Sequence, residues 1–153
     1  MTHLVKHIPD VFEPLGGKLP DTYCMDNTSM WVESWTDPEL MQQLGDLCGI
    51  DARHITTIKQ PCGSCIIRHY DTLYHIRDKW PEDNRLRVRA NIYLEDWEPG
   101  HFLGFQQESG EWFSDCNWKA GNGWIWDREP HHASANAGLT PKYTLQVTGF
   151  LLN

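Results

Sequence analysis

The feature that most constrains the fold is a ten-residue segment, residues 85–94, in which apolar and polar side chains alternate strictly. The apolar set is Leu86, Val88, Ala90, Ile92 and Leu94. The polar set is Arg85, Arg87, Arg89, Asn91 and Tyr93. Because successive side chains of a β-strand point to opposite faces, the pattern predicts a strand with two different faces. The polar face is either the solvated side of an ordinary sheet or a barrel wall that lines a site for an anion.

Further short segments of β-type residues recur along the chain, separated by turn residues such as Pro61-Cys62-Gly63, Pro99-Gly100 and 120–123. These segments are His54–Lys59, Ser64–His69, Phe102–Gln106, Gly123–Trp126 and Lys142–Leu152. Many short strands at this spacing are typical of a sandwich or a barrel, so the sequence predicts a mostly β fold.

One helix is expected before these strands. Pro38 suits the first helical position, and Thr36 with Glu39 forms a candidate capping box. The apolar side chains expected to share one helical face are Leu40, Met41, Leu44 and Leu47. Gly49 ends the pattern. Residues 1–28 are rich in Pro and Gly and are expected to form a loop with at most one short strand.

Length and composition limit the class of protein. A chain of 153 residues is expected to form a single domain over residues 1–153, with its core at about 54–152. A formal charge of −8 gives no strong signal for nucleic-acid binding. No apolar run approaches the roughly 20 residues of a membrane span, and no signal core precedes Pro9, so a cytoplasmic location is expected.

The five cysteines include one Cys-x-x-Cys motif, Cys62-Gly63-Ser64-Cys65. A redox motif would be expected at the start of a helix, and a zinc knuckle would need a second pair of ligands. A β-type segment follows instead, and no second pair is present. We therefore interpret the motif as a tight turn.

A candidate metal site begins at His69-Tyr70-Asp71, which places an imidazole and a carboxylate two residues apart at a strand end. Residues i and i+2 of a strand point the same way, so both side chains could bind one ion. A third ligand could come from His131 or His132, the latter 63 residues after His69. Two histidines and one carboxylate leave three positions of an iron open for substrate and oxygen.

A candidate anion site accompanies this motif. Lys142 lies ten residues after His132 at the start of the last expected strand, where its charge could hold a dicarboxylate that chelates the metal. Tyr93, on the polar face of the alternating segment, could donate its hydroxyl to the same carboxylate.

The combined pattern resembles the iron(II)- and 2-oxoglutarate-dependent oxygenases, particularly the prolyl-hydroxylase-like branch. The stretches that carry the resemblance are residues 67–71, 91–97 and 132–145, and Trp118–Gly121 followed by Trp126-Asp127 is also similar. The resemblance implies a double-stranded β-helix (a jelly-roll or cupin-like barrel) with the N-terminal helix at its flank. It implies Fe(II) held by His69, Asp71 and His132. It also implies 2-oxoglutarate held by Lys142 and Tyr93, with O2 as the second cosubstrate and succinate and CO2 as products.

Some positions depart from the family pattern or admit alternatives. Residues 98–101 replace the Gly-Gly-Glu-Thr type of turn found in many relatives, and the anchor Lys142 is an Arg in most of them. The ten-residue spacing to Lys142 favours His132 over His131, and His101 is a weaker candidate ligand. Arg89 and Asn91 share the face of Tyr93, so they are expected to assist the anchor, to meet an acidic substrate or to lie near the metal.

The primary substrate cannot be read from the sequence. A peptide side chain is the first hypothesis by analogy with the branch, and small metabolites remain open. The alternative function is a non-catalytic β-barrel binding module whose tryptophans form a ligand groove. Trp97 and Trp112 are the candidates for such a surface. A cupin-type metalloenzyme is disfavoured, because its closely spaced His-x-His motif and downstream Glu are absent. No oligomeric state is predicted.

Overall fold

A computed structural model describes residues 31–152 of the chain. This part contains nine strands and two helices. The strands are β1 (Trp31–Trp35), β2 (Ile50–Gln60), β3 (Ser64–His69), β4 (Arg87–Tyr93), β5 (His101–Gln106), β6 (Trp112–Asp115), β7 (Gly123–Trp126), β8 (His132–Asn136) and β9 (Lys142–Leu151). The helices are α1 (Pro38–Cys48) and α2 (Tyr74–Lys79).

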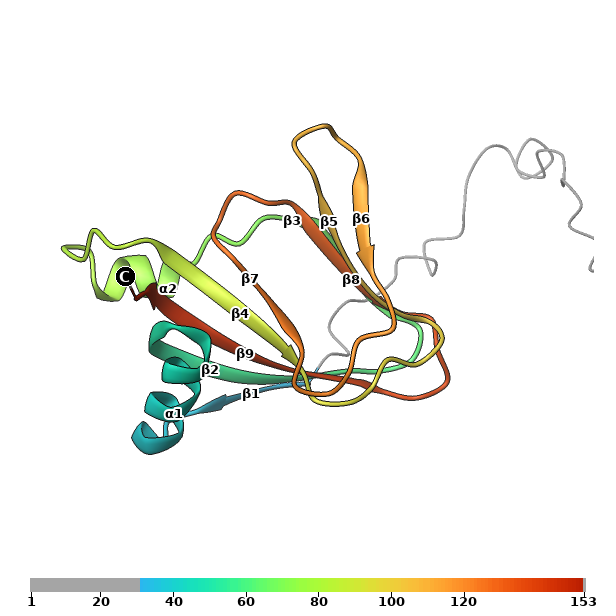
Figure 1. The fold of residues 1–153 in the computed structure, drawn as a ribbon, viewed down its shortest axis with the longest axis horizontal. Coiled ribbons are helices and arrows are strands. Elements are labelled where there is room, and N and C mark those ends of the chain that lie inside the picture. The colour runs from blue at the N-terminus through green and yellow to red at the C-terminus, as the bar shows by residue number, and fades with distance from the viewer. Residues whose placement is uncertain (1–30, 153) are drawn as a thin grey trace, which may run out of the picture.

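The strands form two antiparallel sheets that face each other. One sheet has the order β1-β2-β9-β4-β7, and the other has the order β3-β8-β5-β6. From β2 to β5 and from β6 to β9, each strand lies in the opposite sheet from the strand before it, so the chain winds around a common interior (Figure 1). This arrangement is the expected double-stranded β-helix, and the fold prediction is confirmed.

The larger apolar core lies on the outer face of the five-stranded sheet, beneath α1 (Figure 1), and a second buried cluster of Tyr93, Leu103 and Trp118 lies within the barrel. The buried members of the larger core are Ile50, Ile55, Val88, Ala90 and Val147. Met41, Leu44 and Cys48 of α1 pack against them. The sequence assigned Leu47 to this helical face, but the structure leaves Leu47 83% exposed, and Cys48 takes its place.

The start of α1 also differs from the prediction. Pro38 is the first helical residue as expected, but the cap is Asp37 and not Thr36. The Asp37 carboxylate accepts hydrogen bonds from the backbone N–H of Glu39 at 2.9 Å and of Leu40 at 3.1 Å. At the other end, Gly49 adopts the left-handed conformation (φ 68°) that commonly terminates a helix.

Strand β4 shows the two faces that its alternation predicts. Val88 and Ala90 belong to the core under α1, whereas Arg89, Asn91 and Tyr93 face the interior between the two sheets. Both faces are therefore covered by protein. The interpretation of the polar face as a barrel wall is supported, and that of a solvated outer surface is not.

Four elements were not expected from the sequence: β1, β6, β8 and α2. The Cys62–Cys65 segment connects β2 to β3 through a turn, as predicted, with Gly63 at φ 77°. The prediction for residues 1–28 lies outside the described residues. No helix among residues 31–152 is long and apolar enough to cross a membrane.

The cap assignment is testable by mutation. Asp37→Ala removes the acceptor for two helical N–H groups and should lower the free energy of unfolding by about 1 kcal/mol. Thr36→Ala should change it by less than about 0.5 kcal/mol, as is usual for an exposed side chain. Urea denaturation of both variants measures the difference. Equal destabilisation by the two substitutions would contradict the assignment.

Candidate metal centre

Strands β3 and β8, together with the segment that follows β3, bring His69, Asp71 and His132 close to one another. His69 is the last residue of β3 and His132 the first of β8, and the two are direct partners in the antiparallel pairing of these strands. Asp71 follows β3 by two residues and is 7% exposed. Strand pairing therefore fixes the two imidazoles side by side, and the short step from His69 to Asp71 brings the carboxylate to them.

The donor atoms of the three side chains converge. His69 Nε2 lies 4.0 Å from Asp71 Oδ1, and His132 Nε2 lies 3.8 Å from Asp71 Oδ2. One donor atom from each residue can be chosen so that all three lie within 4.8 Å of one another. Ligands about 2.0–2.2 Å from a shared first-row metal ion are separated by distances of this order. The cluster thus has the dimensions of a metal site.

The imidazoles are oriented for metal binding by their other nitrogens. The Nδ1 atoms of His69 and His132 lie 2.8 Å from the Ile67 carbonyl and 3.1 Å from the Pro130 carbonyl. When Nδ1 donates to a carbonyl, the lone pair of Nε2 is free, which is the usual arrangement for a ligating histidine. Burial lowers the pKa of His132, which favours the neutral form that a metal requires.

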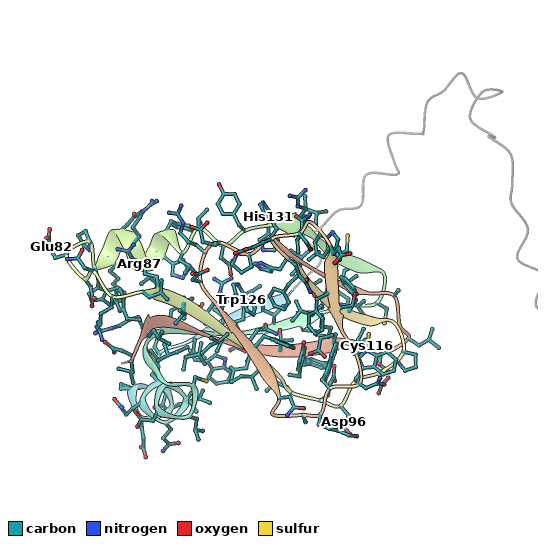
Figure 2. The ribbon with its side chains drawn as sticks, turned by 45° about the horizontal axis from the view of Figure 1, so that its top comes forward. Glu82, Arg87, Asp96, Cys116, Trp126 and His131 are labelled. Carbon is teal, nitrogen blue, oxygen red and sulfur yellow. The ribbon has the colours of Figure 1, made fainter. Side chains whose placement is uncertain are left out.

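The Asp71 carboxylate is held from the opposite sheet. Its Oδ1 accepts a hydrogen bond from Arg89 Nη1 at 2.7 Å, and its Oδ2 accepts one from Trp126 Nε1 at 2.8 Å. Trp126 lies at the centre of the barrel in Figure 2. Such outer contacts fix the orientation of a ligating carboxylate. Arg89, expected near the cosubstrate or substrate, is thus found on the candidate metal ligand. Trp126 was not singled out for this role, because no local pattern connects it to Asp71.

The other candidate histidines lie elsewhere. His131 makes an edge-on ring contact with Tyr70 and lies away from Trp126 in Figure 2. His101 is buried at the start of β5, with Nε2 3.1 Å from the Thr140 carbonyl. Neither belongs to the cluster found among the described residues.

Lys142, the first residue of β9, is a buried cation in the same barrel interior. It is 2% exposed, and its Nζ donates to Ser134 Oγ at 2.6 Å, to the Phe102 carbonyl at 2.7 Å and to Gln60 Oε1 at 3.3 Å. Within residues 31–152, no carboxylate lies within 4.0 Å of it. Burial lowers its pKa to about 7. A buried charge is normally paired, so this ammonium lacks an anion.

A small cavity of about 30 Å³ joins the two sites. His69 and His132 line it on one side and Lys142 on the other, and Asn91 lies on its wall. Gln60 and Ser134, which the sequence analysis did not single out, also line it and bind Lys142. One signal could have found Gln60, because it ends β2 directly opposite Lys142 in the pairing of β2 with β9.

Tyr93 lies close to this region, but its hydroxyl is engaged elsewhere. It donates to Asp115 Oδ2 at 2.8 Å, and its ring stacks on Trp118 at 3.9 Å between centroids. Burial raises its pKa, so the phenol stays protonated and acts as a donor. The centroid of the Trp118 ring in turn lies 5.8 Å from Lys142 Nζ. The structure therefore connects Tyr93 to Lys142 through the indole of Trp118.

Comparisons with known proteins support the fold. No protein family and no curated protein matches the sequence. Among solved structures, a prolyl-4-hydroxylase from Pseudomonas putida is similar with a TM-score of 0.62 and 18% identity, over 91% of this chain and 80% of that one. The nickel complex of the non-heme monooxygenase ThoJ is similar with a TM-score of 0.51 and 18% identity. That match covers 72% of this chain but about half (49%) of the other. At these identities, the likeness establishes a shared double-stranded β-helix.

The three ligands can be tested individually. We expect His69→Ala, Asp71→Ala and His132→Ala each to abolish binding of Fe(II), because two remaining donors hold an ion poorly. His131→Ala is the matched control and should bind Fe(II) like the unmodified protein. Anaerobic calorimetric titration measures the affinities. Loss of binding in His131→Ala together with retention in His132→Ala would assign the site to the other histidine.

Proposed function

We propose that the chain is an Fe(II)- and 2-oxoglutarate-dependent dioxygenase that hydroxylates a substrate not yet identified and releases succinate and CO2. The observation that carries this proposal is the unpaired ammonium of Lys142, in the same cavity as His69 and His132. A ligand that binds a metal at one end and presents a carboxylate at the other satisfies both groups. 2-Oxoglutarate has this chemistry.

The residues present fit a divalent iron. Two neutral imidazole nitrogens and one carboxylate are the donor set typical of non-heme Fe(II) oxygenases, and they leave coordination positions open. When bound there, Fe(II) supplies the redox chemistry with O2, which protein side chains cannot perform. Arg89 and Trp126 keep the Asp71 carboxylate in place.

The residues around Lys142 recognise the far carboxylate in this proposal. The ammonium and the Ser134 hydroxyl, 2.6 Å apart, are two donors that could face one carboxylate. A cavity of about 30 Å³ holds roughly one water molecule, so the dicarboxylate also requires movement of lining side chains. In this proposal Gln60 moves aside and gives up its contacts with Lys142 Nζ at 3.3 Å and with Ser134 Oγ at 2.9 Å.

The remaining side chains position the site and exclude water. Asn91 offers its amide to the cavity, and Leu103 and Ile66 provide apolar wall. Tyr93 stacks on Trp118, which lies next to Lys142. In this proposal the Tyr93 hydroxyl leaves Asp115 and donates to the cosubstrate instead. Exclusion of water strengthens the pairing between Lys142 and a bound carboxylate.

The direct test is succinate formation. The protein, Fe(II), O2 and 2-oxoglutarate are incubated with a panel of peptides and metabolites, and succinate is measured. We expect turnover that is stimulated by one class of substrate and absent in His132→Ala. If neither Fe(II) nor 2-oxoglutarate binds, and no succinate forms with any compound, the alternative of a non-catalytic binding module replaces this proposal.

The anchor assignment gives a second prediction. Lys142→Ala should raise the Kd for 2-oxoglutarate at least about a hundredfold, because loss of one partner of a buried charge pair costs about 3–5 kcal/mol. Tyr93→Phe should raise it by about tenfold, the effect of a single hydrogen bond to a charged group. Lys142→Arg should give an intermediate Kd, because it keeps the charge and changes the donor geometry. Calorimetry with Fe(II)-loaded protein under nitrogen measures all three. The assignment is wrong if Arg89→Ala abolishes binding while Lys142→Ala preserves it.

The pKa of Lys142 predicts a pH dependence. Its pKa of about 7 in the free protein means that a growing fraction of Lys142 is neutral above pH 7. Only the ammonium pairs with the carboxylate, so the Kd for 2-oxoglutarate should rise above pH 7, approaching tenfold per pH unit. In Lys142→Arg, the guanidinium stays charged and the slope should vanish. A flat profile in the unmodified protein would show that Lys142 is not the titrating anchor.

A further inference from the structure

Phe113 of β6 and Trp124 of β7 mark the edge of the barrel where the two sheets end, here called the aromatic opening. Among the described strands, β7 is at one edge of the five-stranded sheet and β6 is at one edge of the four-stranded sheet. Trp124 of β7 pairs with the inward-facing Asn91, and Phe113 of β6 pairs with Phe105. Although both rings belong to the inward faces, Trp124 is 39% exposed and Phe113 is 38% exposed. Both rings are therefore accessible to solvent at this side of the barrel.

Aromatic rings continue from the opening to the candidate metal ligands. Phe113 contacts Trp124 at 5.3 Å between ring centroids, and Trp124 contacts Phe105 at 5.9 Å. Phe105 in turn lies 5.9 Å from His132 and 5.1 Å from Trp126. Two residues along a strand span about 7 Å, so Trp124 is about that far along β7 from Trp126, which binds Asp71. Trp124 therefore lies on the same inward face of β7 as the residue that holds the candidate metal ligand.

One carboxylate belongs to this opening. Asp115 Oδ2 accepts hydrogen bonds from Trp124 Nε1 at 2.6 Å and from the Tyr93 hydroxyl at 2.8 Å. Its Oδ1 accepts no hydrogen bond, and no cation lies within 4.0 Å of it, in the part of the chain that the structure describes. Asp115 is thus a carboxylate at the N–H edge of the Trp124 indole, with no counterion among residues 31–152.

The chain segment that contains β6 and β7 is acidic. The carboxylates of residues 106–131 are Glu108, Glu111, Asp115, Asp127 and Glu129. The two cations of this segment are already paired, Lys119 with Asp96 and Arg128 with Glu129. The outward-facing Trp112 and Ile125 are 42% and 44% exposed, so apolar surface extends along both edge strands beyond the opening. That surface is suited to the residues that flank a side chain in a peptide.

We infer that the aromatic opening formed by β6 and β7 binds the basic side chain of a peptide, with its cation on the face of the Trp124 ring and against Asp115 Oδ1. An aromatic face and an unpaired carboxylate together favour an ammonium or a guanidinium over a neutral group. This inference rests on the proposed function and names its substrate class: a peptide that carries Lys or Arg. Lys and Arg both carry the required side-chain cation, and a binding experiment with each peptide distinguishes between them.

The test measures binding without turnover. The full chain, labelled with ¹⁵N and free of metal, is titrated with four peptides that differ only at the central residue, which is Lys, Arg, norleucine or Glu. The indole Nε1–H resonance of Trp124 reports binding. We expect the Lys or the Arg peptide to bind at least about tenfold more tightly than the norleucine peptide, and the Glu peptide to bind most weakly.

Matched variants locate the cation. Asp115→Asn keeps an oxygen acceptor for Trp124 and Tyr93 but removes the charge, and should weaken binding of the basic peptide about tenfold. Glu111→Gln removes a nearby exposed carboxylate and should leave the affinity unchanged. Trp124→Phe should weaken binding, since indole is the better cation–π partner, whereas Trp112→Phe on the outer face should not. Dispersed spectra confirm that each variant is folded.

The inference is overturned if norleucine binds as tightly as both basic residues, or if Asp115→Asn and Glu111→Gln have equal effects. Its failure is separable from that of the oxygenase assignment. Succinate formation with peptides that lack a basic residue would retain the proposed function and overturn this inference. Selective binding of basic peptides by a protein that holds no iron would retain the cation site as a recognition surface and reject the oxygenase.

Discussion

The Asp71 carboxylate joins the two sheets of the barrel. It follows β3 of the four-stranded sheet, and both of its oxygens accept hydrogen bonds from the five-stranded sheet, one from Arg89 on β4 and one from Trp126 on β7. Three strands thereby converge on one side chain. Because a buried carboxylate is costly without partners, these donors both stabilise the closed barrel and hold Asp71 beside His69 and His132. The geometry of the candidate metal centre and the closure of the fold therefore depend on the same contacts.

Part of the barrel interior is polar, beside the buried cluster of Tyr93, Leu103 and Trp118. The larger apolar core lies outside the five-stranded sheet, under α1, whereas Lys142, Asn136 and Gln60 are buried within the barrel at 1–2% exposure. Asn136 is satisfied by the carbonyls of Gln60 and Thr140, at 2.9 and 2.8 Å. Lys142 has hydrogen-bond acceptors but no counter-charge among the described residues. If Lys142 served only the stability of the fold, an apolar side chain in its place would give a more stable protein. The presence of the ammonium therefore indicates a ligand.

Much of the fold was predictable from residues 85–94. A strand that is covered on both faces needs two different sets of side chains, and the alternating sequence shows both sets. The missed elements lack local signals. Strand β8, His132–Asn136, is built from small and polar residues that suit a crowded interior but have low β propensity. Helix α2 is six residues long, and the residue that precedes it at the cap position, Leu73, makes no side-chain cap. His69 and Asp71 were predicted together from strand periodicity, and His132 from its spacing to Lys142 and the family resemblance. The contacts of Arg89 with Asp71 and of Tyr93 with Asp115 have no such signal, because they arise only when distant strands meet.

The central claim is that one cavity holds a metal at the His69, Asp71 and His132 end and a dicarboxylate at the Lys142 end. Anaerobic addition of Fe(II) and then 2-oxoglutarate to the full chain, followed by visible absorption, tests both halves at once. We predict a weak charge-transfer band that appears only when both are present, saturates at one equivalent of each, and is absent in His132→Ala. A protein that binds neither component, or a band that persists in His132→Ala, would contradict the claim.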